Sequence, residues 1–199
     1  MKTIQSLMMK SGAMLCCIAA LFSCRPGTTS TEQTAESTAE QQTQQEDTWQ
    51  MAIDRYLVDS IAPGYSQGEM CIPFTQVVAT DESAPDSVLV WGSYWVMNYN
   101  TSGDTLKTVS GGNHAGLMHV SHDGGHWRVT AFDAVGDGSR FQPTAKQIFG
   151  PNFEAFMKII SDEKTREMVR KEAIADYVKQ RGLNVTLYQD FGWEPIPIK

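Results

Sequence analysis

The chain has 199 residues, of which 41% are hydrophobic and 20% charged, and its formal net charge is −7. This acidic balance argues against nucleic-acid binding, because proteins that bind nucleic acids present basic surfaces to the phosphates. The length is enough for one hydrophobic core of ordinary size and marginal for two.

The N-terminus, MKTIQSLMMKSGAMLCCIAALFSC, is typical of an export signal. Lys2 and Lys10 form its basic start, and residues 13–22 form a short apolar run. That run is too brief to cross a bilayer, which takes about 20 apolar residues. We therefore expect residues 1–23 to be a signal peptide that is removed from the mature protein.

The four residues Leu21-Phe22-Ser23-Cys24 resemble the lipobox of bacterial lipoproteins. The resemblance implies that Cys24 becomes the new N-terminus and carries acyl chains such as palmitate. Each buried CH₂ of such chains contributes about 0.8 kcal/mol to membrane binding. An ordinary signal peptide with a chance cysteine is the alternative. Because no acidic residue directly follows Cys24, we expect a protein of the cell envelope that is anchored to the outer membrane and faces the periplasm.

Residues 24–47 are predicted to be a disordered tether. From Arg25 to Asp47 there is no aromatic residue and no Val, Ile, Leu or Met, so the segment cannot bury enough apolar surface to fold. Residues 48–199 then form one domain. Only Cys71 remains in it, so we expect no internal disulfide.

The domain is predicted to begin with an amphipathic helix. Asp47-Thr-Trp-Gln50 has the pattern of a capping box with Asp47 as the N-cap. Apolar residues then recur at helical spacing from Trp49 to Ile61, and Pro63-Gly64 ends the run.

Strand patterns follow the helix. Residues 70–80 predict an edge strand because of Pro73, and residues 88–99 predict a central strand that is apolar on both faces and bent at Gly92. We expect a turn at 100–104 and a strand over 105–110 that Gly111-Gly112 interrupts. A hairpin of residues 114–121 and 126–134 then turns at Asp123-Gly124-Gly125.

The remaining chain is predicted to be mainly helical. Thr144-x-x-Gln147 predicts the start of a short helix, and residues 153–160 predict a second. A longer helix is expected from the cap Asp162 to about Arg181, with Gly182 ending it. A last strand is expected within residues 183–189.

This order of elements predicts an α+β fold, in which an N-terminal helix packs on a curved antiparallel sheet and helices follow. The layout resembles the cystatin-like and NTF2-like superfamily over residues 48–135. The resemblance implies a sheet that wraps the first helix and leaves a pocket. The C-terminal helices depart from the usual pattern of that group.

All four histidines lie between residues 114 and 126. Alternation along the hairpin, with a two- or four-residue loop, places His119 and His126 on a mixed face with Arg128, and His114 near Asp133 at the far end of an apolar face. His122 lies at the turn. The members of the predicted apolar face are Met118, Val120, Trp127, Val129 and Ala131.

Two kinds of chemistry can be considered for this hairpin. A two-histidine site of His119 and His126 with Asp123 is a weak candidate for metal binding, since it lacks a third obvious ligand and Arg128 would repel a cation. We therefore expect no metal and no cofactor. His114 oriented by Asp133 could act as an acid or base, but a structural hydrogen bond explains the same pair.

Aromatic residues supply the remaining candidates. Trp91, Tyr94, Trp95 and Trp127 could line a ligand pocket, although aromatic strands more often belong to a core. The segment from Tyr188 to Trp193 is rich in groups useful for binding, yet an aromatic tail docked on the sheet is an equal explanation.

The sequence holds no glycine-rich phosphate loop after a strand, no nucleophile elbow and no paired-histidine helix motif. We therefore expect a lipid-anchored envelope protein whose domain binds a small ligand or a protein partner without catalysis. An NTF2-like enzyme that uses His114 and Asp133, and a purely structural envelope protein, remain the alternatives.

Overall fold

The computed structural model describes residues 47–199. The predicted signal peptide, Cys24 and the tether before Asp47 lie outside this range. The described residues form an α+β domain in which a curled sheet is preceded by one helix and followed by others, as predicted. Within residues 47–199, no helix combines the length and the hydrophobicity needed to cross a membrane.

The first helix, α1, spans Trp49–Tyr56 and continues through a π-helical turn, Leu57–Ile61, and a 3₁₀ turn, Ala62–Gly64. Its N-cap is Thr48, whose hydroxyl accepts a hydrogen bond from the backbone N–H of Met51. The prediction of Asp47 as the N-cap is therefore wrong by one residue.

Asp47 has a different role, because its carboxylate reaches the sheet. It accepts hydrogen bonds from the backbone N–H of Trp127 at 2.7 Å and from the guanidinium of Arg55 at 2.8 Å. These bonds lower the pKa of Asp47, with the Arg55 bond contributing most. Asp47 was predicted to be the last residue of the tether, but it makes contacts that belong to the domain.

The sheet has the order β1-β2-β3-β5-β6, and β4 also pairs with β3. β1 is an edge strand and β2 a central one, as predicted. Because β5 runs parallel to β3, the sheet is mixed rather than purely antiparallel. The strands are β1 Met70–Ala84, β2 Ser87–Ser102, β3 Thr105–Asp123, β4 His126–Ala134, β5 Leu187–Gln189 and β6 Ile196–Pro197.

β3 is continuous through Gly111 and Gly112, so the predicted break is wrong. These glycines allow close packing instead. A Cβ atom on Gly112 would lie 2.2 Å from the hydroxyl of Tyr65, and one on Gly111 would lie 2.4 Å from the carbonyl oxygen of Val96. Gly112 therefore makes room for Tyr65, and Gly111 allows the close approach of β2.

Three further helices follow the sheet, α2 Phe141–Phe149, α3 Phe153–Ser161 and α4 Glu163–Arg181. Single 3₁₀ turns, Gly138–Arg140 and Gly150–Asn152, precede α2 and α3. The predicted ends of α4 are confirmed, since Asp162 caps its first turn and Gly182 ends it in the left-handed conformation. Thr144 does not start a helix; it lies inside α2, where its hydroxyl bonds the carbonyl of Arg140 and the N–H of Gly136.

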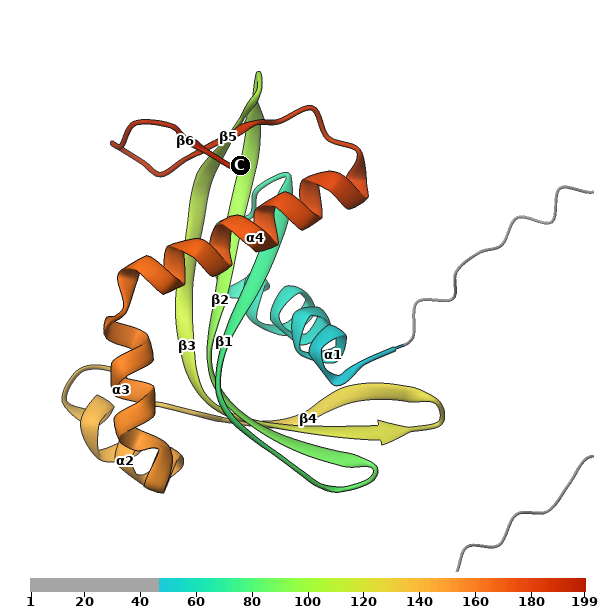
Figure 1. The fold of residues 1–199 in the computed structure, drawn as a ribbon, viewed down its shortest axis with the longest axis vertical. Coiled ribbons are helices and arrows are strands. Elements are labelled where there is room, and N and C mark those ends of the chain that lie inside the picture. Colours follow the sequence, from blue (N-terminus) through green and yellow to red (C-terminus); the bar gives the residue numbers. More distant parts are fainter. Residues whose placement is uncertain (1–46) are drawn as a thin grey trace, which may run out of the picture. The chain divides into compact units, whose positions relative to one another are not determined.

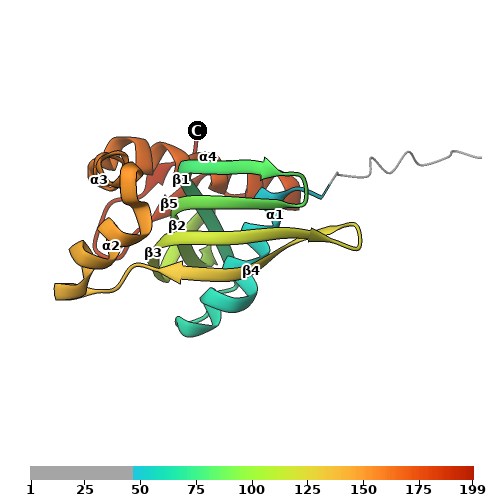
Figure 2. The ribbon, with the colours of Figure 1, turned by 90° about the horizontal axis from the view of Figure 1, so that it is seen from below.

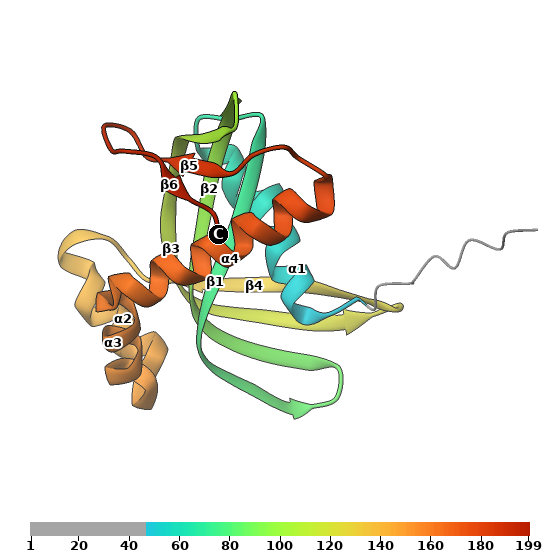
Figure 3. The ribbon, with the colours of Figure 1, turned by 45° about the horizontal axis from the view of Figure 1, so that its top comes forward.

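The helices cover both faces of the sheet, and α1 lies within its bend (Figure 1). α4 crosses the strands on the other face, with α2 and α3 beyond its N-terminus (Figures 2 and 3). The core on the α1 side includes Ile53, Leu57, Val90 and Val96. The opposite side has two clusters, one under α2 and α3 and one under the C-terminal half of α4. The concave face is therefore filled by side chains.

Candidate ligand-binding site

A β-bulge between His119 and Val120 sets the faces of the β3–β4 hairpin. Next to the turn, Val120 lies opposite Val129, which is the predicted pairing. Beyond the bulge the register shifts by one residue, so Phe132 rather than Ala131 packs against the core. The prediction for the apolar face is therefore correct near the turn and wrong for Ala131, which is exposed.

The bulge also changes the partners of the histidines. Asp133 is bonded to His119, with 2.9 Å between its Oδ2 and Nε2 of the ring, and His114 is bonded to the hydroxyl of Tyr65 at 2.8 Å. The predicted pair of His114 and Asp133 is therefore not formed. The carboxylate of Asp133 is 58% exposed, so it does not face an enclosed cavity.

His114 is half-buried beside the ring of Tyr65, and the two rings meet edge to face. Burial lowers the pKa of His114, while the charge of Asp137 opposes that change. Burial, and then the charge of Asp137, raises the pKa of Tyr65. The neutral forms of both side chains are therefore favoured, and their hydrogen bond joins the end of the first helical segment to β3.

The weak candidates for a metal site do not gather around one point. Asp123 is paired with Arg128, with 2.7 Å between the carboxylate and the guanidinium, and His126 is 82% exposed. Among residues 47–199, no group of three or more His, Cys, Asp or Glu side chains has the geometry to hold a metal ion.

The four aromatic candidates do not line one pocket, because the sheet divides them. Tyr94 is fully buried on the α1 side, where Trp127 packs at the edge of the same cluster. Trp91 lies under α2 and α3, and its indole N–H donates to the carbonyl of Ile148 at 2.9 Å. Trp95 stacks on Phe74, with 5.6 Å between the ring centroids.

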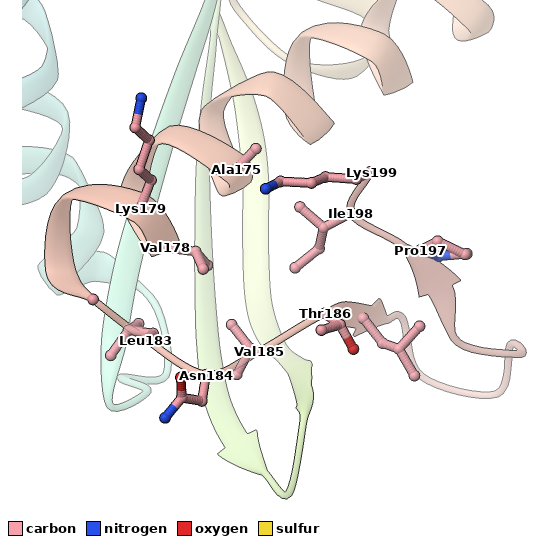
Figure 4. Close-up of a pocket in the computed structure, with 12 residues that line it drawn as sticks. Ala175, Val178, Lys179, Leu183, Asn184, Val185, Thr186, Pro197, Ile198 and Lys199 are labelled. Carbon is pink, nitrogen blue, oxygen red and sulfur yellow. The ribbon is translucent and has the colours of Figure 1, made fainter.

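The clearest pocket lies elsewhere, between the C-terminal half of α4 and the final segment of the chain. Its volume is about 550 Å³, within the range of small-ligand sites. Val178 on α4, Val185 before β5 and Ile198 after β6 converge on it (Figure 4). Leu183, Leu187, Pro197 and Ala175 extend the apolar wall. The pocket is therefore mainly apolar.

Two lysines lie at this pocket and differ in direction. The side chain of Lys199 extends across the opening toward Ala175, whereas that of Lys179 points away from the cavity (Figure 4). Within residues 47–199, neither amine forms an ion pair. A positive charge without a partner over an apolar cavity favours a ligand with one acidic group.

An ion pair between a buried arginine and a partly exposed aspartate joins α4 to the residue that follows β5. Arg170, which is 6% exposed, donates two hydrogen bonds to the carboxylate of Asp190, at 2.8 and 2.6 Å. It also donates to the hydroxyls of Tyr99 and Thr108. The guanidinium lowers the pKa of Asp190. Because β5 leads into one wall of the pocket and α4 forms the other, this network fixes their separation.

Sequence reasoning did not find this pocket. Of the aromatic residues between Tyr188 and Trp193, only Tyr188 packs into the core, whereas Phe191 and Trp193 are exposed, so the expectation of an aromatic tail docked on the sheet holds for Tyr188 alone. Val185 lies in the stretch 183–189 where a last strand was predicted, of which residues 187–189 form β5, and Ile198 lies beyond it, where no element was predicted. Only the return of the chain over α4 brings them together.

Comparison of the chain with protein-family models, with curated proteins and with solved structures gives no match. The resemblance to bacterial lipoproteins and to the cystatin-like and NTF2-like superfamily stays a prediction from the sequence.

Proposed function

We propose that this protein is a lipid-anchored protein of the bacterial cell envelope, and that its domain binds a small, mainly apolar carboxylate without catalysis. Cys24 would provide the anchor, and the pocket between α4 and the final segment would hold the ligand. The observation that carries the proposal is an apolar cavity of about 550 Å³ with one unpaired amine, that of Lys199, across its opening.

The physical argument combines burial and charge. Val178, Val185 and Ile198 offer a surface on which an aliphatic or aromatic body gains about 25 cal/mol per Å² of buried area. A carboxylate at the opening can stay partly hydrated and pair with Lys199. Such a partly exposed pair contributes about 0.2–1 kcal/mol, so it sets the preferred charge more than the affinity.

Binding of octanoate, measured by isothermal titration calorimetry on the full chain, tests this proposal. Octylamine has the same tail with the opposite charge, and we expect it to bind more weakly. Lys199→Ala should weaken the binding of octanoate about 1.4- to fivefold, the equivalent of its ion pair. Lys179→Ala is the matched control, because its amine points away, and it should change little.

Equal binding of octanoate and octylamine would contradict the charge preference. The absence of any heat or saturation with octanoate and with longer carboxylates would contradict the proposed ligand class. The alternative of acid–base chemistry by His114 and Asp133 gains no support, since these residues have separate partners.

A further inference from the structure

Two aromatic side chains stand out from the domain between β5 and β6. Phe191 is 96% exposed and Trp193 is 73% exposed, whereas Met168, the next large apolar side chain, is 53% exposed. We call residues 191–193 the aromatic tip. Tyr188, three residues before Phe191, is fully buried, so the chain leaves the core abruptly at this point.

The aromatic tip is held in place by its own base. Asp190 is fixed by Arg170 and by the hydroxyl of Thr108, and it accepts a hydrogen bond from the backbone N–H of Trp193 at 3.1 Å. The side chain of Gln189 donates to the carbonyl of Trp193 at 2.8 Å. Because its backbone is already held, the aromatic tip loses little conformational freedom when it binds a surface.

The area of the tip limits what can hold it. A phenylalanine and a tryptophan bury about 150–250 Å² each. Together they offer on the order of 400 Å², whereas a stable protein interface buries about 1,200–2,000 Å². The aromatic tip alone is therefore too small to hold a second copy of the chain or a protein partner.

Binding to a lipid surface needs less buried area than binding to a protein, because the tether keeps the domain close to the membrane. The chain between Cys24 and Asp47 reaches at most about 83 Å, at roughly 3.6 Å per residue. A linked second contact of this kind acts at an effective concentration that can reach the millimolar range, so a weak contact is enough.

The chemistry of the tip fits the headgroup region of a neutral bilayer. Tryptophan is enriched at that depth, because its ring is apolar and its N–H can reach water or headgroups. The charge of Asp190 is balanced by Arg170, whereas Glu194, beside the tip, forms no ion pair within residues 47–199. Attraction to anionic lipids is therefore not expected.

We propose that the aromatic tip inserts Phe191 and Trp193 into the headgroup region of the bilayer that holds Cys24. This inference rests on the proposed lipid anchor, and it does not depend on the ligand of the pocket. It fixes one end of the domain, at the β5–β6 connection, against the membrane.

Tryptophan quenching tests the insertion. The lipid-carrying mature protein is reconstituted in phosphatidylcholine vesicles with brominated acyl chains, and flotation first establishes that the protein is bound. We expect bromine to quench part of the tryptophan emission. Trp193→Phe should remove that quenched part, whereas Trp49→Phe, on α1, is the control and should keep it. Trp193 is mostly exposed, so its replacement by Phe leaves the fold intact.

Each outcome has a defined meaning. Protein that floats without quenching overturns the insertion and leaves the anchor standing. Quenching that persists in Trp193→Phe also overturns it, because another tryptophan then meets the lipid. Protein that does not float overturns the anchor and the insertion together. If Trp193 resists iodide quenching in native envelopes but not in vesicles, the tip meets a protein partner instead, and the proposal is wrong.

Discussion

Replacement of Asp190 by Ala should destabilise the domain more than any other change to an ion pair that the structure describes. Arg170 is almost fully buried and loses the two short hydrogen bonds that balance its charge. Removing one partner of a buried pair costs about 3–5 kcal/mol. Because the side chain of Asp190 is itself 39% exposed, water can replace part of the carboxylate, and we expect a loss of about 2–3 kcal/mol.

Urea unfolding at pH 7, followed by far-ultraviolet circular dichroism, measures this loss. In a domain of this size, 2–3 kcal/mol also lowers the thermal midpoint by roughly 4–12 °C. Asp133→Ala is the matched control, since it removes the surface pair with His119 and should cost less than about 1 kcal/mol. Arg170→Met combined with Asp190→Ala should recover part of the loss, because no buried charge is then left without a partner.

The same pair predicts a dependence on pH. Arg170 lowers the pKa of Asp190 in the folded state below its usual 3.8. The stability that the pair contributes is therefore complete above pH 3.8 and is lost as the pH falls through the lower folded value. Equal and small losses for Asp190→Ala and Asp133→Ala would refute the reasoning, since they would mean that Arg170 does not depend on its carboxylate.

Three further predictions concern other parts of the chain. Gly112→Ala should cost about 1–3 kcal/mol in urea unfolding, because its Cβ would displace the hydroxyl of Tyr65, whereas Gly64→Ala has open space around it and should be neutral. Burial lowers the pKa of His114, so the stability of the wild type should fall as the pH drops below 6.5, and His114→Gln should show a flatter profile between pH 7 and 5. Cys24→Ser should move the protein from the membrane to the soluble fraction, and unchanged retention would contradict lipidation.

Local signals in the sequence were enough to predict the ends of α4 and the central position of β2 in the sheet. Asp162 and Gly182 mark the ends of α4 because a helix needs an acceptor at its first turn and a residue that tolerates the left-handed conformation after its last. The central position of β2 followed from its apolar residues on both faces.

The predictions were wrong where one extra residue changes the pairing of two strands, or where segments far apart in the sequence come into contact. The bulge beside His119 adds one residue to β4, and that single residue moves Asp133 from the face of His114 to that of His119. Gly112 was interpreted as a strand break, because its contact with Tyr65 joins residues that are far apart in the sequence and leaves no local pattern. The pocket depends on Ile198 returning over α4, which no local pattern encodes.

The central claim is that the cavity between α4 and the final segment binds a small apolar carboxylate. Methyl-resolved NMR during a titration with octanoate tests it most directly. The account predicts saturable shifts confined to the methyl groups of Val178, Val185 and Ile198 and their neighbours, with those of Val90 and Val96 on the α1 side unchanged. Saturable shifts centred on the α1 side, or no saturable shift at the three pocket residues, would contradict it.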